Sequence, residues 1–463
     1  MRDFDLLVIG SGPAGERGAV QAAIFGKRVG VIEREPVLGG ASANTGTLPS
    51  KTLRETSLTL SGLRARGFRA VEVHHHLETT LEDFLFREKY VMATERKRIA
   101  DNLEAHDIEL IPGEASFIDP HTLRVTERDG SARDCTAEVI LIATGSHPFR
   151  PPQFPFEDDR VFDSDEIVSL KEIPKSLVVA GAGVIGVEYA CLFAALGVKV
   201  TLTEQKESML GFLDREIVTR LSKSMTEELG IDLRFKTNIA KLGLDGPGVD
   251  LQLTDGSALH ADAVLIASGR SGNTKALNLE KVGITANSRG HIDVDERYRT
   301  ALSHVYAAGD VIGFPALGST SMEQGRIAVV DAFDLKFRTS LAPVLPYGIY
   351  SIPEVSMAGE TEESLTTAGI PYVVGRAKFS EIARGTIIGD QRGMLKLLFR
   401  KQDVRLVGVH VLGEQATELV HFGLSALLVG ATADFFIQTC FNYPTLHEAY
   451  KYATYDAVHA ARD

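Results

Sequence analysis

Residues 5–15 read Asp5-Leu-Leu-Val-Ile-Gly10-Ser-Gly12-Pro-Ala-Gly15, an apolar run that ends in a Gly-x-Gly-x-x-Gly turn. The apolar run predicts a strand over residues 5–9. The residues after the turn predict a helix over 14–25 and a second strand over 29–33. A strand, a glycine turn, a helix and a strand in this order are typical of a dinucleotide-binding unit.

Three glycines and one acid of this unit each have a physical role. Gly10 permits the tight turn, Gly12 lets the backbone approach a pyrophosphate, and Gly15 lets the helix pack closely on the strand. The free N–H groups at the helix N-terminus attract the phosphates. Glu33 stands 18 residues after Gly15, where it can accept hydrogen bonds from an adenosine ribose.

A second glycine turn of the same kind reads Gly181-Ala-Gly183-Val-Ile-Gly186. It lies between a predicted strand over 176–180 and a predicted helix over 184–196, and a strand over 199–204 follows. That strand ends in Glu204, whose carboxylate can bind a ribose 2′-hydroxyl and would repel a 2′-phosphate. This favours NAD(H) at the second unit, while Lys206 nearby leaves NADP(H) open.

Composition and charge make some partners unfavourable. The chain has 463 residues, of which 44% are hydrophobic and 24% charged, as expected for a globular protein of two to four domains. Its net charge of −13 disfavours binding to the phosphates of nucleic acid. It also lacks a Lys/Arg run on which a polybasic membrane anchor could be built.

Cysteine usage and the N-terminus point to the cytoplasm. Cys135, Cys191 and Cys440 form no CxxC or CxxxxC pair, so neither a redox motif nor a metal site is predicted. No stretch approaches 18 apolar residues, and the N-terminal apolar run is too short for a signal peptide. The three histidines at 74–76 are interpreted as solvated surface.

Residues 39–51 carry an informative departure from a known pattern. They read Gly39-Gly-Ala-Ser-Ala-Asn-Thr-Gly-Thr-Leu-Pro-Ser-Lys51 and resemble the active-site segment of the glutathione reductase and lipoamide dehydrogenase family. In the disulfide-using members, two cysteines stand where this chain has Ser42 and Thr47. A thiolate pair accepts electrons because sulfur can be attacked and cleaved, and hydroxyls cannot do this. The resemblance implies the scaffold of a flavoenzyme without its dithiol.

The same resemblance assigns FAD to the first unit and the nicotinamide nucleotide to the second. Residues 300–310 resemble the second FAD signature of this class, in which the aspartate binds the ribityl chain of the flavin. A helix expected to begin within 315–326 would direct its N-terminal dipole at the flavin. The residues expected at the nucleotides are Gly10, Gly12, Gly15, Glu33, Gly40, Thr45, Lys51, Ala115, Thr144, Gly145, Gly181, Gly183, Gly186, Glu204, Gly269, Arg270, Gly309 and Asp310.

Four residues are expected at the reaction centre by resemblance. In the family, the lysine of the Pro-Ser-Lys run pairs with a glutamate near flavin and nicotinamide; here these are Lys51 and Glu188. A cation at that place favours the negative charge that arrives with hydride. The family's His-Pro-Thr segment closes the site of the partner subunit, and here Tyr443 replaces its histidine while Glu448 is kept. His447 is expected at the surface.

The expected fold class is α/β, with two Rossmann-like dinucleotide-binding domains and a C-terminal α+β dimerisation domain. We expect the FAD-binding domain at 1–150 and 275–335, the NAD(P)-binding domain at 151–274 and the dimerisation domain at 336–463. The last of these is expected to combine strands with two amphipathic helices. The resemblance implies a homodimer or a larger homo-oligomer.

Nearly the whole chain resembles the soluble (Si-specific) pyridine nucleotide transhydrogenase branch of the flavin disulfide reductase family. The implied activity is hydride transfer between NAD(H) and NADP(H) through FAD, by a ping-pong mechanism that uses no disulfide. An NAD(P)H diaphorase, which passes electrons from FAD to a quinone or other acceptor, would have the same motifs. A non-catalytic FAD-containing structural subunit is a further alternative, against which the intact Lys51, Glu188 and second glycine turn speak.

Overall fold

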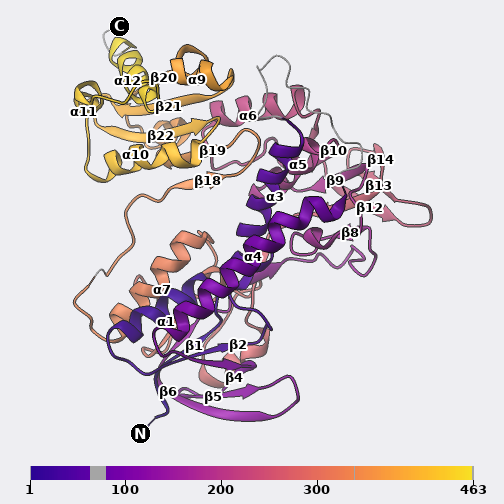
Figure 1. Ribbon diagram of the computed structural model, residues 1–463, viewed down its shortest axis with the longest axis vertical. Coiled ribbons are helices and arrows are strands. Elements are labelled where there is room, and N and C mark those ends of the chain that lie inside the picture. Colours follow the sequence, from indigo (N-terminus) through magenta and orange to yellow (C-terminus); the bar gives the residue numbers. More distant parts are fainter. Residues whose placement is uncertain (1, 63–79, 338, 461–463) are drawn as a thin grey trace.

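The computed structural model describes residues 2–62, 80–337 and 339–460, and these residues form three lobes (Figure 1). The histidine run at 74–76 lies outside the described residues. Within the described part of the chain, every helix is too short or too polar to span a bilayer.

The first lobe is built around the first glycine turn. Its elements are β1 (Phe4–Ile9), α1 (Pro13–Ile24), β2 (Val29–Glu33), α2 (Gly40–Asn44), α3 (Thr47–Leu60), α4 (Leu81–Glu104), β3 (Glu109–Pro112), β4 (Glu114–Asp119), β5 (Thr122–Thr126), β6 (Ala132–Ile142), β17 (Val305–Ala307) and α7 (Gly318–Ala332). Strands β3, β2, β1, β6 and β17 pair in parallel, and β4 and β5 extend β6 as an antiparallel meander. Figure 1 shows α3 and α4 running from this lobe towards the second.

The second lobe repeats the same construction around the second glycine turn. Its elements are β8 (Val161–Phe162), β9 (Ser176–Ala180), α5 (Val184–Ala195), β10 (Lys199–Glu204), α6 (Arg215–Glu227), β11 (Asp232–Phe235), β12 (Ile239–Gly243), β13 (Val249–Leu253), β14 (Ala258–Ala261) and β15 (Ala263–Ile266). The parallel sheet has the order β11-β10-β9-β15-β8. An antiparallel pair, β7 (Ser146–Pro148) with β16 (Arg270–Gly272), joins this lobe to the first.

The predicted elements of both units are present, so the expected α/β class with two Rossmann-like units is confirmed. Strands β2, β9 and β10 have the predicted bounds, and the predicted ends of α1 and α5 are correct to within one residue. The apolar strands are almost completely buried, because helices cover the parallel sheets.

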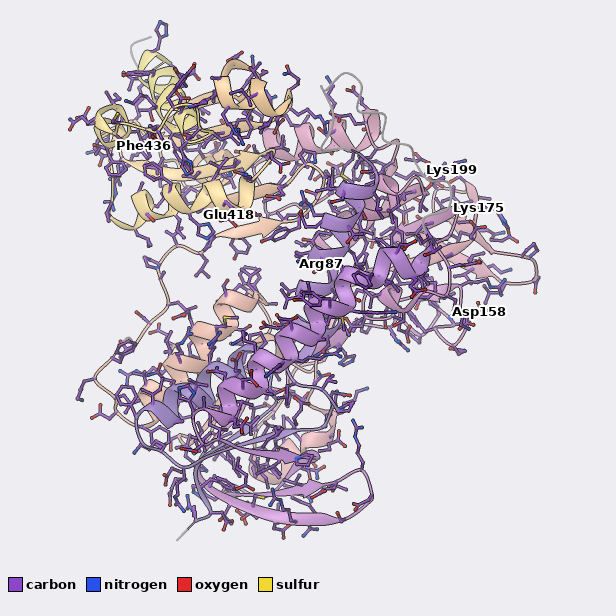
Figure 2. The ribbon with its side chains drawn as sticks, viewed as in Figure 1. Arg87, Asp158, Lys175, Lys199, Glu418 and Phe436 are labelled. Carbon is purple, nitrogen blue, oxygen red and sulfur yellow. The ribbon has the colours of Figure 1, made fainter. Side chains whose placement is uncertain are left out.

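The C-terminal lobe is a five-stranded antiparallel sheet with helices. Its elements are β18 (Tyr347–Ile349), β19 (Val355–Gly359), α8 (Glu362–Thr367), β20 (Tyr372–Lys378), α9 (Ala383–Ile388), β21 (Met394–Arg400), β22 (Leu406–Leu412), α10 (Ala416–Leu428), α11 (Ala433–Gln438) and α12 (Glu448–Ala460). Its core includes Phe436, labelled in Figure 2, whose ring stacks on Tyr450 at a centroid distance of 5.7 Å.

The prediction of two helices in this lobe was wrong, because the described residues form five. Helices α8, α9 and α11 have six residues each, too few to leave an amphipathic pattern in the sequence. Helix α8 begins in a reciprocal cap, in which Thr361 Oγ1 accepts from the backbone N–H of Ser364 at 3.1 Å.

Candidate functional site

The first glycine turn is packed so closely that side chains are excluded from it. A Cβ on Gly10 would lie 2.4 Å from the carbonyl oxygen of Ala143, and one on Gly15 would lie 1.9 Å from that of Gly10. Gly12 is different, since a Cβ there would only meet the Cα of Gly40, at 3.9 Å. The turn therefore has space on the side where α2 begins, as a backbone that approaches a pyrophosphate requires.

Glu33 is held beside this turn by three donors. One carboxylate oxygen accepts from the backbone N–H of Ser11 at 2.9 Å and from its hydroxyl at 2.6 Å, and the other accepts from the N–H of Glu35 at 2.9 Å. The carboxylate oxygens keep further lone pairs for a ribose. A cavity of about 460 Å³ opens next to the acid; among its lining residues are Glu33, Leu38, Leu110, Pro112, Gly113 and Arg128.

Two buried hydroxyls support the assignment of FAD to this lobe. Thr45 Oγ1 and Thr144 Oγ1 are both buried without a hydrogen-bond partner among the described residues. Buried hydroxyls are nearly always bonded, so these two are suited to a polar ligand. Gly145 follows Thr144 with a φ of +68° and open space where a Cβ would be, and Ala115 is buried in β4. The residues present fit a bound dinucleotide such as FAD.

Asp310 lies at the end of a polar chain that connects the first two lobes. Its Oδ2 accepts from the hydroxyl of Ser146 at 2.7 Å, and that hydroxyl oxygen accepts from Arg270 Nε at 2.8 Å. Arg270 also pairs with Asp165 at 2.9 Å. Ser146 thus fixes the orientation of the Asp310 carboxylate through Oδ2, and Oδ1 does not bond to Ser146. The sequence indicated Asp310 and Arg270 but not Ser146, which belongs to no motif.

Gly309, Gly269 and the altered segment surround the same region. The N–H of Gly309 donates to Gln324 Oε1 at 2.9 Å, and a Cβ on Gly269 would meet open space. A Cβ on Gly318, the first residue of α7, would lie 4.0 Å from Ser42 Oγ. The N-terminus of α7, which begins within the predicted range 315–326, therefore lies against the segment that lacks the cysteines.

Lys51 and Glu188 meet at the junction of all three lobes. Lys51 of α3 donates to Glu188 Oε2 of α5 at 2.7 Å, and the other oxygen of Glu188 accepts from the backbone N–H of Tyr350 at 2.9 Å. Lys51 Nζ also lies 5.1 Å from the centre of the Tyr350 ring. The predicted pair is present, and Tyr350, which was not predicted at this site from the sequence, completes it.

The second glycine turn repeats the packing of the first. A Cβ on Gly181 would lie 2.5 Å from the carbonyl oxygen of Ala267, and one on Gly186 would lie 1.8 Å from that of Gly181. A Cβ on Gly183 would meet open space. Glu204 accepts from the N–H groups of Ala182 at 2.8 Å and Lys206 at 2.9 Å.

The C-terminal segment exposes Tyr443 and buries part of Glu448. Tyr443 is 74% exposed, while Glu448 Oε2 is buried without a partner among the described residues. His447 was expected at the surface, but it is half-buried, with its ring 6.0 Å from that of Phe422 and 6.4 Å from that of Tyr450. Burial lowers the pKa of His447, so the ring is neutral at physiological pH.

The cysteines offer no dithiol. Cys135 and Cys191 are buried and Cys440 is exposed, all as free thiols. Burial raises the pKa of Cys135, and it raises the pKa of Cys191 to about 12, so that neither thiol ionises readily.

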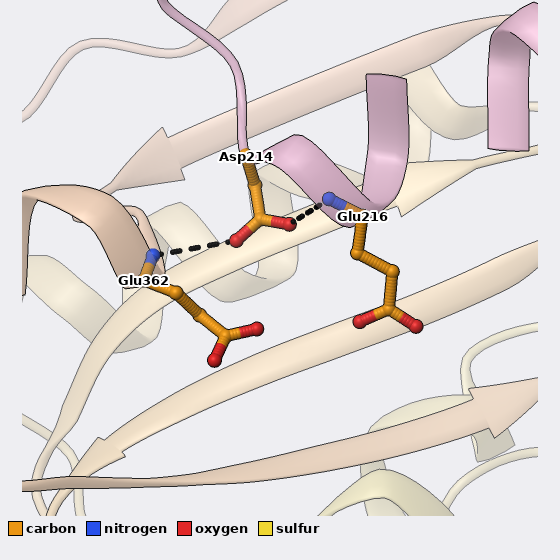
Figure 3. A group of neighbouring side chains, drawn as sticks. All are labelled: Asp214, Glu216 and Glu362. Atoms are coloured by element: carbon orange, nitrogen blue, oxygen red, sulfur yellow. Dashed lines mark hydrogen bonds between the residues drawn. The ribbon is translucent and has the colours of Figure 1, made fainter. Parts of the chain in front are cut away.

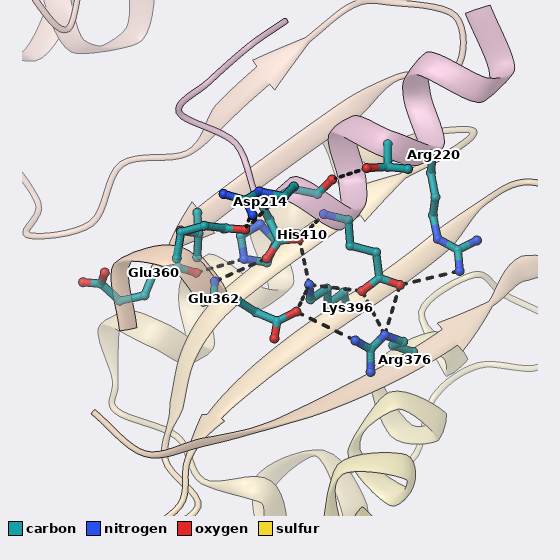
Figure 4. A network of polar contacts seen from close by, with 12 residues as sticks. Asp214, Arg220, Glu360, Glu362, Arg376, Lys396 and His410 are labelled. Carbon is teal, nitrogen blue, oxygen red and sulfur yellow. Dashed lines mark hydrogen bonds and ion pairs between the residues drawn. The ribbon is translucent and has the colours of Figure 1, made fainter. Parts of the chain in front are cut away.

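A cluster of three carboxylates between the second lobe and the C-terminal sheet has the composition of a metal site, but the ammonium group of Lys396 lies among them. Oxygens of Asp214, Glu216 and Glu362 lie within 4.8 Å of one another (Figure 3). Lys396 pairs with all three, at 2.7 Å from Asp214 and 3.1 Å from Glu216, and Arg376 pairs with Glu216 at 2.9 Å (Figure 4). This charge network joins α6 of the second lobe to the C-terminal sheet.

Comparison with known proteins agrees with this geometry. Residues 4–329 match the family model described as pyridine nucleotide-disulphide oxidoreductase, and residues 345–454 match the dimerisation domain of that family. The chain is 44% identical to the soluble pyridine nucleotide transhydrogenase of Mycobacterium bovis, over 100% of this chain and 98% of the relative. It is 40% identical to the soluble pyridine nucleotide transhydrogenase of Aliivibrio fischeri, over 97% and 96% of the two chains.

Solved structures of flavoproteins have the same fold at lower sequence identity. The HOCl-induced flavoprotein disulfide reductase RclA of Escherichia coli is 28% identical, with a TM-score of 0.88 over 97% of this chain and 99% of that one. LpdA of Mycobacterium tuberculosis is 27% identical, with a TM-score of 0.89 over 97% and 99%.

Proposed function

Because this chain belongs to the pyridine nucleotide-disulphide oxidoreductase family, we propose that it transfers hydride between NAD(H) and NADP(H), with FAD as its resident cofactor. When bound, FAD would take hydride from one nicotinamide and return it to another. The relatives that are 40–44% identical over nearly their full length bear the name of this activity.

The Lys51–Glu188 pair is the observation that carries the proposal. The Lys51 side chain is 25% exposed and that of Glu188 is 8% exposed, and their 2.7 Å contact spans α3 and α5. Glu188 is fixed in turn by Tyr350 N–H. A cation held this firmly between the two glycine-turn units can stabilise negative charge without reorganising, which is how preorganised charges accelerate a reaction.

We propose that the two nucleotides use the second unit in turn, and that no disulfide takes part. Ser42 and Thr47 occupy the two cysteine positions, and their hydroxyls cannot relay electrons. Tyr443 replaces the histidine that manages thiol protons, and histidine is the side chain most often used for general acid–base catalysis. The two departures are consistent with each other, since an enzyme without a dithiol needs no base for it.

We propose a homodimer in which Tyr443 and Glu448 close the site of the partner subunit. Support comes from the large exposed fraction of Tyr443 and from the buried, unpartnered oxygen of Glu448 within the described chain. We assign residues 1–150 and 275–335 to FAD binding, 151–274 to nucleotide binding and 336–463 to dimerisation. The site residues predicted from the sequence are proposed in the roles given above.

The test is anaerobic reduction of the purified enzyme with one equivalent of NADPH, followed by rapid mixing with NAD⁺. Flavin reoxidation at the rate of turnover is the expected result. A flavin that stays reduced until a quinone is added would replace this proposal with the diaphorase alternative. A flavin that neither NADH nor NADPH reduces would point to the non-catalytic subunit.

A further inference from the structure

Three aromatic side chains, one from each lobe, lie together where the lobes meet. Tyr347 belongs to β18 of the C-terminal lobe, and the centre of its ring lies 5.8 Å from that of Phe212 and 6.5 Å from that of Phe314. The planes of the Phe314 and Tyr347 rings are nearly parallel, at 20° to each other. Figure 1 shows β18 on the side of the C-terminal lobe that faces the other two lobes. We call these three residues the aromatic trio.

Phe212 is held next to the second glycine turn. The N–H of Leu210 donates to the carbonyl oxygen of Ala182, inside that turn, at 3.1 Å. The N–H of Leu213 donates to the carbonyl oxygen of Leu210 at 2.9 Å, which closes a tight turn that contains Phe212. The Phe212 side chain is 45% exposed. It therefore stands at the entrance of the unit assigned to the nicotinamide nucleotide.

Phe314 is held next to Asp310, the residue predicted at the flavin. The N–H of Gly313 donates to the carbonyl oxygen of Asp310 at 3.0 Å, and the N–H of Ala316 donates to that of Gly313 at 3.1 Å. Phe314 lies inside the second of these turns and is 83% exposed. A single exposed aromatic ring is ordinary, but exposed rings grouped beside a site are typical of contact with an apolar ligand.

Tyr347 is anchored in its strand and connects the aromatic trio to the charged pair of the site. It lies opposite Met357 of β19, and its carbonyl oxygen accepts from the hydroxyl of Ser356 at 2.7 Å. Three positions further along the chain, the N–H of Tyr350 donates to Glu188 at 2.9 Å. Three residues of a strand span about 10 Å. The aromatic trio and the charged pair are therefore neighbours along one segment.

We infer that the aromatic trio is the contact surface for the nicotinamide ring of the exchanging nucleotide, with Phe314 as a residue that favours its oxidised form. The inference rests on the proposed use of nicotinamide nucleotides. The oxidised ring is flat and aromatic and carries a positive charge, whereas the reduced ring is neutral. The negative faces of aromatic side chains attract a flat cation. The nearest ionic groups, Lys51 and Glu188, are paired at 2.7 Å and offset each other's charge.

The experiment is calorimetric titration of the oxidised, FAD-containing enzyme with NAD⁺ and with ADP-ribose, which has the same phosphates and riboses but no nicotinamide. Wild type should bind NAD⁺ more tightly. Phe314→Leu keeps an apolar side chain but loses the aromatic face, so it should weaken NAD⁺ binding about fivefold and ADP-ribose binding less than about twofold. Phe314→Tyr keeps the face and should bind both ligands as wild type does.

A third ligand tests the preference for the oxidised ring. The analogue 1,4,5,6-tetrahydro-NAD is neutral and cannot donate hydride to the flavin. The ratio of its dissociation constant to that of NAD⁺ should fall about fivefold in Phe314→Leu, because only the cation gains from the aromatic face. An unchanged ratio would overturn the assignment of the preference to Phe314.

Phe25→Leu is the matched control, since Phe25 is an exposed ring at the end of α1 that is remote from the first glycine turn. It should leave all three dissociation constants unchanged. The inference is overturned if wild type binds NAD⁺ no more tightly than ADP-ribose, if Phe314→Leu weakens both equally, or if Phe25→Leu acts like Phe314→Leu. The titrations need no hydride transfer, so a positive result stands even if NADPH-reduced enzyme fails to reduce NAD⁺. That failure would count against the proposed function alone.

Discussion

Glu33 and Glu204 end the same strand in two copies of one unit, yet their surroundings differ. Glu33 is 8% exposed and accepts from the hydroxyl of Ser11, which in turn accepts from the N–H of Gly39 at 3.0 Å. Glu204 is half-buried, and Ala182 stands in the place of Ser11. The residues that follow Glu204 are exposed.

Under the proposed function, this difference explains how one backbone could serve a resident and an exchanging nucleotide. In the first unit, the serine ties the acid to the segment that begins at Gly39, and Gly40 at the start of α2 faces Gly12 of the turn. In the second unit, Ala182 has no hydroxyl with which to make that connection, and a Cβ on Gly183 would meet open space. A site that opens by breaking more bonds releases its ligand more slowly.

Replacing the third glycine of each turn by alanine should give the largest difference in behaviour between the two units. The methyl of Gly15→Ala would lie 1.9 Å from a carbonyl oxygen and that of Gly186→Ala 1.8 Å from another. We expect Gly15→Ala to yield protein without flavin absorbance. Gly186→Ala should keep its flavin but be reduced by NADH more than about 100-fold more slowly, since misplacement of about 1 Å has that effect.

Gly246→Ala is the control for both glycine variants, because a Cβ there meets open space in an ordinary backbone conformation. It should match wild type in absorbance and in reduction rate. Loss of flavin from Gly186→Ala with retention in Gly15→Ala would reverse the assignment of the two units.

Lys396→Met should have the next largest effect, a loss of stability. Lys396 connects the C-terminal sheet to the second lobe and not to the first. The side chain is fully buried among Asp214, Glu216 and Glu362. Removing one partner of a buried ionic cluster lowers the free energy of unfolding by about 3–5 kcal/mol. Thermal and denaturant unfolding of the FAD-containing protein measure this.

Lys97→Met serves as the comparison for Lys396→Met, since Lys97 is 74% exposed in its pair with Asp101. It should change the free energy of unfolding by less than about 0.5 kcal/mol. Equal losses from the two variants would mean that the buried cluster does not hold the lobes together.

Ser11→Ala should weaken FAD binding by a smaller amount. It removes the 2.6 Å hydrogen bond to Glu33 and leaves the N–H of Gly39 without its acceptor. A buried donor left unpaired costs about 1–3 kcal/mol, which corresponds to a rise of about 5- to 150-fold in the FAD dissociation constant. The reciprocal variant Ala182→Ser should change the KM for NADH less than about threefold, and a large change would show that the second unit is as closed as the first.

A change of pH should have the smallest effect on stability, and this effect also arises at the Asp214–Lys396 pair between the second lobe and the C-terminal sheet. Burial by itself raises the pKa of Asp214, but His410 and Lys396 lower it below its usual value overall. Burial lowers the pKa of Lys396, but Asp214 and Glu362 raise it above its usual value overall. The stability that Asp214 contributes is present above pH 3.8, the pKa of an ordinary aspartate, and is lost as the pH falls through the pKa of Asp214 in the folded protein. The stability that Lys396 contributes is present below pH 10.5, the pKa of an ordinary lysine, and is lost as the pH rises through the pKa of Lys396 in the folded protein.

The difference in melting temperature between wild type and Lys396→Met measures this dependence. It should stay constant from about pH 5 to 9 and shrink in stronger acid, because protonated carboxyls need no cation. A difference that varies strongly between pH 5 and 9 would assign the effect to another group.

The backbone around both turns could be predicted because it is encoded locally. Gly10 and Gly181 stop a strand and start a helix, so the bounds of β2, β9 and β10 follow from the sequence. The Lys51–Glu188 pair was predicted through resemblance, although 137 positions separate the two residues.

The remaining contacts have no local signal. Ser146 and Tyr350 act through partners that only the folded chain brings near, Asp310 for the first and Lys51 with Glu188 for the second. The short helices α8, α9 and α11 exist because tertiary packing and caps hold them, not because a repeat encodes them. Lys396 looks in the sequence like any lysine of a strand.

The charge network around Lys396 also constrains how this chain can change over generations. A single substitution of the lysine leaves three acids together, and a single substitution of Asp214 removes an acceptor for the N–H groups that begin both α6 and α8. Each first step passes through a less stable protein, while an apolar replacement of all members at once could be tolerated. These residues are therefore expected to persist or to be replaced as a set, and related chains should show either the whole network or none of it.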